Sequence, residues 1–252
     1  MLVGNRSFDD GEEMDSVVTS SSQHEILTSA CHVDVRHGFV RKVFGLVACQ
    51  LALTALIAAP FVVFYDSVAP ALIQYQGLVA FVMVFPLLLT CVAMCRPHLL
   101  REYPSNYGFL AAMTVSMGVL VGFACMRYEA WSILGVAGLT AGIVAGLGAF
   151  AMQTKYDFTG MAPYLFACLL CLIVTSFVLA LFPISQPVMM VYSGLGSLLF
   201  CFYIIYDIQM IVDGKHHAYR FAIDEYVYAA LHLYLDIINL FLHLLRMFGE
   251  RR

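Results

Sequence analysis

The chain alternates between long apolar stretches and short polar connections. Seven apolar stretches occupy residues 41–64, 75–95, 106–126, 131–151, 162–183, 189–211 and 224–248. Each is near the roughly 20 residues that a helix needs to cross a bilayer. Backbone polar groups cannot face lipid unpaired, so the pattern predicts an all-α membrane protein, a seven-helix bundle. The connections are short, and we therefore expect consecutive helices to pack antiparallel.

The first 34 residues differ from the rest. They contain seven of the 17 acidic residues and a Ser-rich run, with Arg6 as the only Lys or Arg. Such a segment cannot bury enough apolar surface to fold alone. We predict a disordered cytosolic tail over 1–34 and a polytopic transmembrane domain over 35–252.

Composition excludes a soluble protein and a nucleic-acid-binding protein. Hydrophobic residues make up 62% of the chain and charged residues 12%, against about 25% charged residues in soluble domains. The net charge of −4 comes from the acidic tail, and no basic surface for nucleic acid is present. We expect no cofactor, while the bilayer itself is the expected environment.

Lys and Arg in the connections predict the orientation, because they favour the cytosolic side. Alternate connections carry Arg36, Arg41, Lys42, Arg96, Arg101, Lys155, Lys215 and Arg220, whereas the others carry only Arg127. The N-terminus is therefore expected in the cytosol. Seven crossings would place the basic residues 246, 251 and 252 on the far side, whereas a re-entrant last segment would keep them cytosolic. The sequence leaves both open.

The last apolar stretch carries polar residues at steps of three or four, which places them on one helical face. They are Glu225, Tyr228, His232, Asp236, Asn239, His243 and Arg246. A polar stripe of this length faces the bundle interior or a water-filled path rather than lipid. In the preceding stretch, Asp207 is a second intramembrane acid, with Tyr203 one turn before it.

If the two acids meet, they share a proton and titrate as a pair. Asp207 and Asp236 are therefore the candidate pH sensor and gate, and transient calcium ligands. Tyr203, His232, Asn239 and His243 are the candidate pore-lining residues. A polar clasp that only fixes helix register is the structural alternative. Three glycines spaced four residues apart in the fourth stretch, Gly138, Gly142 and Gly146, predict close packing by another helix.

Several motifs resemble a known family. Tyr206–Gln209 and Leu233–Phe241 resemble the Bax-inhibitor family of membrane proteins. Gln153–Thr159 is similar to the signature of its lifeguard and Golgi anti-apoptotic branch, and Val35–Phe44 is similar to the start of that branch's first span. The resemblance covers about residues 34–250. The tail lacks the Pro/Gly/Tyr-rich repeats of longer lifeguard members, which leaves the subgroup, and a cellular or viral origin, open.

The resemblance implies six helices around a central one, which would be the C-terminal helix bearing Asp236. It also implies calcium leak from internal stores, in the endoplasmic reticulum or Golgi, and suppression of cell death. The family's pH-sensing pair maps onto Asp207 and Asp236. A basic residue after the second span latches the pair in bacterial relatives, and Arg101 and Arg96 are both candidates here.

The leading hypothesis is thus a pH-sensitive, calcium-permeable leak channel, with calcium as permeant ion and no enzymatic activity. A non-conducting regulator of cell-death membrane proteins is the alternative. An intramembrane aspartyl protease needs Gly-x-Gly-Asp, whereas Leu233-Tyr234-Leu235 precede Asp236. A zinc hydrolase needs ligands that meet, but His232 and His243 lie about three turns apart. The sequence contains no motif that indicates the oligomeric state or the ion selectivity.

Overall fold

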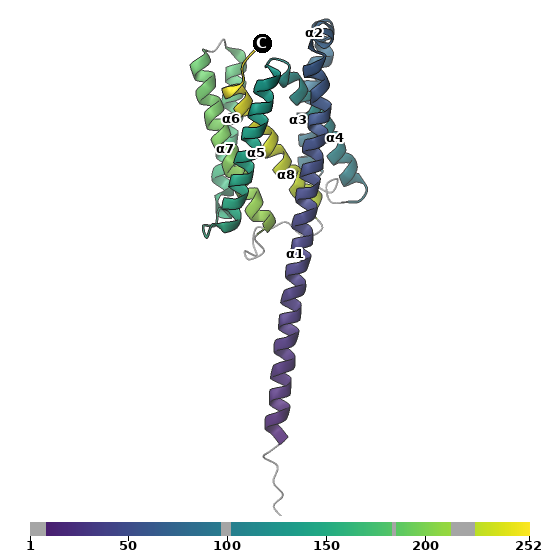
Figure 1. Cartoon of the computed structure of the whole chain (residues 1–252), viewed down its shortest axis with the longest axis vertical. Helices are drawn as coiled ribbons and strands as arrows, with labels where there is room; N and C mark the ends of the chain where they lie inside the picture. The colour runs from purple at the N-terminus through teal and green to yellow at the C-terminus, as the bar shows by residue number, and fades with distance from the viewer. Residues whose placement is uncertain (1–8, 97–101, 183–184, 213–224) are drawn as a thin grey trace, which may run out of the picture.

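The computed structural model describes residues 9–96, 102–182, 185–212 and 225–252, and these form a bundle of helices (Figure 1). A single 3₁₀ turn, Thr159–Met161, precedes α6, and the described residues contain no strand beyond one isolated bridge. The helices are α1 Asp9–Val63, α2 Tyr65–Gln74, α3 Gln76–Cys95, α4 Ser105–Cys125, α5 Ala130–Gln153, α6 Ala162–Leu181, α7 Gln186–Val212 and α8 Tyr226–Phe248. The predicted all-α fold is confirmed.

Among the described residues, six helices are long and apolar enough to cross a membrane: α1 from Arg36 onward, α4, α5, α6 with its preceding turn, α7 and α8. The second predicted span is α3, whose apolar stretch, Val79–Ala93, is shorter. Between α1 and α3 the chain forms the short helix α2, so the predicted first span ends at Val63. This is a multi-pass membrane protein.

Helix α8 is the most enclosed of the spans. In its apolar 18-residue stretch 61% of the residues are buried, against 6% in that of α6. It packs against α7, α1, α5 and α4, whereas α3 packs on α4 and α6 packs on α7. Lipid tails are as apolar as leucine, so close side-chain packing holds such a bundle together. The prediction that the C-terminal helix is central is confirmed.

The C-terminal end of α8 meets the connection between α4 and α5. Tyr128 and Arg251 form an antiparallel bridge, and the Glu129 backbone N–H donates to the Glu250 carbonyl at 2.9 Å. The Arg252 side chain lies 3.7 Å from the Glu129 carboxylate. The chain therefore ends beside the α4–α5 connection, and α8 is one continuous helix over Tyr226–Phe248.

Two features differ from the sequence expectations. Helix α1 starts at Asp9 and projects beyond the bundle (Figure 1), where a disordered tail over residues 1–34 was expected. No proline interrupts this segment, and extending an existing helix is easier than nucleating one. On α5, a Cβ at Gly138, Gly142 or Gly146 would meet nothing within 4 Å. Close packing of these glycines against another described helix is therefore wrong.

Candidate functional site

The two intramembrane acids meet where α7 packs against α8. The side chains of Asp207 and Asp236 share a hydrogen bond. Two ionised carboxylates offer only acceptors, so this contact requires one proton between the two groups. Consecutive antiparallel helices bring residues 207 and 236 to the same level of the bundle. The structure thus joins the two acids that the sequence singled out.

The two carboxyl groups differ in environment. Asp207 is 3% exposed, and its Oδ2 has no hydrogen-bond partner among the described residues. Asp236 is only half-buried. Tyr203, one turn before Asp207 and also half-buried, lies within electrostatic range of both acids. One acid is therefore enclosed by protein, whereas the other borders accessible space.

The polar stripe of α8 faces this accessible space over much of its length. His232 is exposed, Asp236 and Asn239 are half-buried, and Arg246 near the other end is exposed. Its opposite face is enclosed, with Leu233, Tyr234 and Leu240 almost completely buried. The helix therefore turns its apolar side into the protein and leaves its polar side more accessible. That distribution fits a wetted path better than a lipid-facing surface.

Contacts within α8 or with α7 hold four members of the stripe. The Asn239 amide N–H donates to the Leu235 carbonyl at 2.8 Å, within α8. The rings of Tyr228 and His232 meet edge to face with centroids 4.5 Å apart. His243 is buried at 8% exposure between aromatic rings of α7. The accessible part of the stripe thus stops short of His243.

Only one of the two latch candidates lies within the described residues. Arg96 is exposed just after α3, and Arg101 lies outside the described residues. Sequence reasoning missed a basic residue that does reach α7. Arg36 of α1 donates from its guanidinium to the Met210 carbonyl at 2.9 Å, one turn beyond Asp207. Its position at the start of a span gave no signal, because this contact joins residues distant in sequence.

A second contact at this end of α7 was also missed. The Gln209 side-chain amide donates to the Tyr156 carbonyl at 2.9 Å, and its oxygen accepts from the Phe158 backbone N–H at 2.8 Å. Gln209 therefore ties the α5–α6 connection to α7, two residues after Asp207. The two motifs noted in the sequence, 153–159 and 206–209, are thus one interacting unit.

The comparisons with known proteins agree with these motifs. A family model described as "Inhibitor of apoptosis-promoting Bax1" matches residues 36–252. The chain belongs to the Bax inhibitor family. It is 37% identical over 226 residues to the BI1-like protein of Arabidopsis thaliana, covering 86% of this chain and 82% of that protein. It is 34% identical over 245 residues to Protein lifeguard 4 of Mus musculus, covering 95% and 92% of the two chains.

A further relative is Protein LIFEGUARD 3 of Arabidopsis thaliana, which is 35% identical over 236 residues, covering 89% of this chain and 90% of that protein. The family match includes both acids, the polar stripe and the 153–159 connection. Family names of this kind describe regulators of cell death rather than enzymes. The lifeguard resemblance predicted from the sequence is confirmed.

Within the described part of the chain, no group of three or more His, Cys, Asp or Glu side chains is placed to hold a metal ion. The acid pair supplies oxygen ligands from two side chains only. Such a pair suits brief contact with a passing cation better than a resident metal, because calcium takes about 6–8 oxygen ligands.

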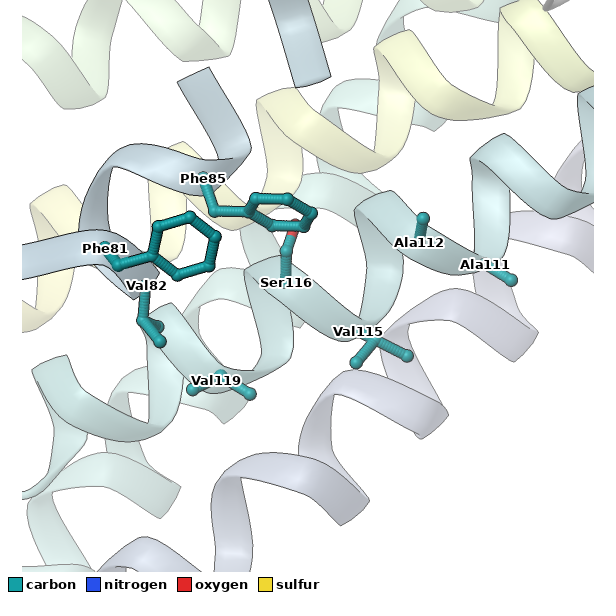
Figure 2. A pocket seen from close by; sticks show the side chains of 8 residues that line it. All are labelled: Phe81, Val82, Phe85, Ala111, Ala112, Val115, Ser116 and Val119. Carbon is teal, nitrogen blue, oxygen red and sulfur yellow. The ribbon is translucent and has the colours of Figure 1, made fainter. Parts of the chain in front are cut away.

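A groove of about 420 Å³ lies elsewhere, between α3 and α4 (Figure 2). Phe81 and Phe85 of α3 and Val115 of α4 line it, and Ser116 contributes the one hydroxyl. That hydroxyl donates to the Met113 carbonyl of its own helix at 3.0 Å. The groove is therefore apolar and distinct from the acid pair.

Proposed function

We propose that this protein is a pH-sensitive, calcium-permeable leak channel of an intracellular membrane, the endoplasmic reticulum or Golgi. By lowering store calcium it would inhibit apoptosis, and its N-terminus would lie in the cytosol. The observation that carries the proposal is the Asp207–Asp236 contact within the accessible polar stripe of α8. Relatives named for Bax inhibition and as lifeguard proteins support the link to cell death.

The chemistry of the pair supports cation passage. Calcium is a hard ion that prefers oxygen ligands, which two carboxylates supply. With a proton shared between them the pair carries one negative charge, and loss of that proton adds a second. Rings or pairs of acids favour cation entry, so deprotonation would promote conduction and protonation would close the path. Flux would therefore rise with pH across the range in which the shared proton is lost.

Latching by a basic residue remains part of the proposal. Arg96 and Arg101 stay candidates for a closed state, since a cation beside the pair would neutralise it. Arg36 instead has a positioning role, because it holds the last turn of α7 through a backbone carbonyl. Removal of a latch would raise flux, whereas removal of a positioning residue would disturb the acid contact.

The test is calcium efflux from loaded liposomes that contain the purified protein, measured across pH. Asp236→Asn and Asp207→Asn cannot ionise, and we expect each to lower efflux and flatten its pH response. Asp66→Asn is the matched control, because Asp66 is an exposed acid of α2 away from the pair. Native efflux and an unchanged pH response in both pair variants would refute the proposal.

A second candidate is a non-conducting regulator that binds membrane proteins of the cell-death pathway. The description of the matching family, an inhibitor of apoptosis-promoting Bax1, favours this reading. Cells that express the Asp236→Asn variant distinguish the two candidate functions. Full protection by a variant that has lost efflux would support the regulator and contradict protection by calcium leak.

A further inference from the structure

The accessible polar stripe of α8 closes at one residue. His232 is exposed and Asp236 and Asn239 are half-buried, yet His243, the next polar residue along the stripe, is only 8% exposed. Beyond it, Arg246 is exposed again. The stripe therefore has two accessible parts that are separated by a buried imidazole.

A glycine of α7 receives that imidazole. A Cβ added at Gly196 would lie 2.7 Å from His243 Nε2, with the Cε1 and Nδ1 atoms of the ring nearer still. Real Cβ atoms do not approach other heavy atoms so closely, so the ring occupies the space that any larger residue would fill. Gly196 thus forms a notch in α7 for the His243 side chain.

Two aromatic rings complete the seal. The Tyr192 and Phe200 rings lie 5.5 Å and 5.6 Å from the imidazole, centroid to centroid. These residues stand one turn on either side of Gly196, so they flank the notch along α7. At this level the contact between α7 and α8 leaves the imidazole almost no accessible surface.

The sealed region nevertheless contains polar atoms without partners. His243 Nδ1 and Ser193 Oγ are both buried and make no hydrogen bond within the described part of the chain. Buried polar groups are normally paired with protein or water, and an apolar seal would need neither of them. A water molecule or hydrated cation that passes this level would find a donor or acceptor on each helix.

We propose that His243, seated in the Gly196 notch, is a second constriction that closes the conduction path on the Arg246 side of the acid pair. The inference rests on the proposed function and adds to it a residue-level site of closure. The acid pair attracts the cation, and the imidazole controls whether the path beyond Asn239 is continuous. Displacement of the ring joins the two accessible parts of the stripe.

The experiment uses the full chain in calcium-loaded liposomes, with no other ion gradient. We expect His243→Ala to raise efflux about tenfold, equivalent to a barrier lower by about 1.4 kcal/mol. His243→Phe keeps a ring in the notch and should stay far below His243→Ala. Gly196→Ala should also raise efflux, because its Cβ expels the imidazole.

The double variant Gly196→Ala/His243→Ala decides between a notch and helix spacing. If the glycine acts by seating the imidazole, the double variant conducts no faster than His243→Ala alone. Gly194→Ala is the matched control, since its Cβ would make only ordinary contact, 3.9 Å from Met247 Sδ. An additive effect of Gly196→Ala, or a rise in Gly194→Ala of the same size, would overturn the inference.

Folding is followed by size-exclusion elution and thermal midpoint, so that loss of structure is not mistaken for opening. Native-level efflux in well-folded His243→Ala overturns the inference, while Asp236-dependent efflux in the same preparation leaves the proposed function intact. Native protein without any efflux overturns both. The two failures are therefore distinguishable.

Discussion

The contact between Gln209 and the α5–α6 connection lends itself to a quantitative test. Gln209 is 2% exposed in the last turns of α7, two residues after Asp207. Its amide bonds to both Tyr156 and Phe158 of the connection, at 2.9 Å and 2.8 Å. Gln209→Ala removes both hydrogen bonds without changing charge. We expect the connection to detach from α7 more often.

The free-energy cost of Gln209→Ala differs between its two hydrogen-bond partners. Tyr156 is 79% exposed, so its carbonyl can turn to water once the amide is lost. Phe158 is half-buried, and its backbone N–H would lose its acceptor. A lost hydrogen bond costs about 0.5–1.5 kcal/mol, and an unpaired buried donor costs about 1–3 kcal/mol. The larger effect comes from Phe158, and we expect about 2 kcal/mol in total.

Trypsin reports this detachment directly, because Lys155 lies exposed in the connection. When opening and reclosing are fast, cleavage tracks the population of the open form. A change of about 2 kcal/mol raises that population roughly 30-fold, which sets the expected increase in the cleavage rate after residue 155. The fragment is identified by mass, so that cuts at other basic residues do not interfere.

Gln186→Ala is the control, because Gln186 is exposed at the first residue of the same helix. Gln209→Glu adds a sharper comparison: it keeps an acceptor for the Phe158 N–H but turns a carboxylate toward the Tyr156 carbonyl. We expect it to detach the connection to an intermediate degree. An unchanged cleavage rate in Gln209→Ala would show that the contact does not hold the connection in place.

Two further predictions concern helix packing. Tyr234→Phe removes a buried hydrogen bond of 2.7 Å between the Tyr234 hydroxyl and Thr54 Oγ1, which joins α8 to α1. We expect the free energy of unfolding to fall by about 1 kcal/mol in a denaturant titration. An unchanged midpoint would contradict this expectation. Gly122→Ala places a Cβ 2.5 Å from the Phe61 ring, and overpacking should cost about 1–3 kcal/mol. Gly138→Ala, with nothing within 4 Å of its Cβ, should be neutral or stabilising by up to about 1 kcal/mol, and equal losses in both glycine variants would refute the packing argument.

The sequence was sufficient where one local pattern decides the outcome. Polar residues recur at steps of three and four along 225–246, which places them on one face of α8. A charged side chain at bilayer depth costs free energy, so that face is directed away from lipid. Asp207 and Asp236 lie on consecutive spans with a short connection, so antiparallel packing brings them together. The central position of the last helix came from family resemblance, and the burial of α8 confirms it.

The remaining features depend on contacts between distant segments. Arg36 reaches the Met210 carbonyl across 174 residues of sequence, and the motif around residue 36 does not encode that partner. The glycines of α5 and Gly196 of α7 look alike in sequence. A Cβ at Gly138, Gly142 or Gly146 of α5 would face open space, whereas Gly196 accommodates His243 of a neighbouring helix. Spacing of small residues shows that close approach is allowed, but it does not show that a partner is present.

The side on which the chain ends was left open for a similar reason. Basic residues near the C-terminus favour one side of the membrane. The Arg252 backbone N–H donates to the Arg127 carbonyl at 3.1 Å, and the Glu250 N–H donates to Ser132 Oγ at 2.9 Å. These contacts place the end of α8 beside the start of α5, a result that loop charges alone could not give.

Both ends of the α7–α8 pair are thus tied to other elements. Arg36 and Gln209 hold one end of α7, and the residues after Gly249 hold the far end of α8. The acid pair and His243 lie between these ties. Under the proposed function, gain or loss of one proton at the pair therefore acts on side chains and water between fixed helix ends. A large helix displacement would first have to break both sets of contacts. We therefore expect gating to survive a cross-link between positions 251 and 128, but not the loss of Asp207 or Asp236.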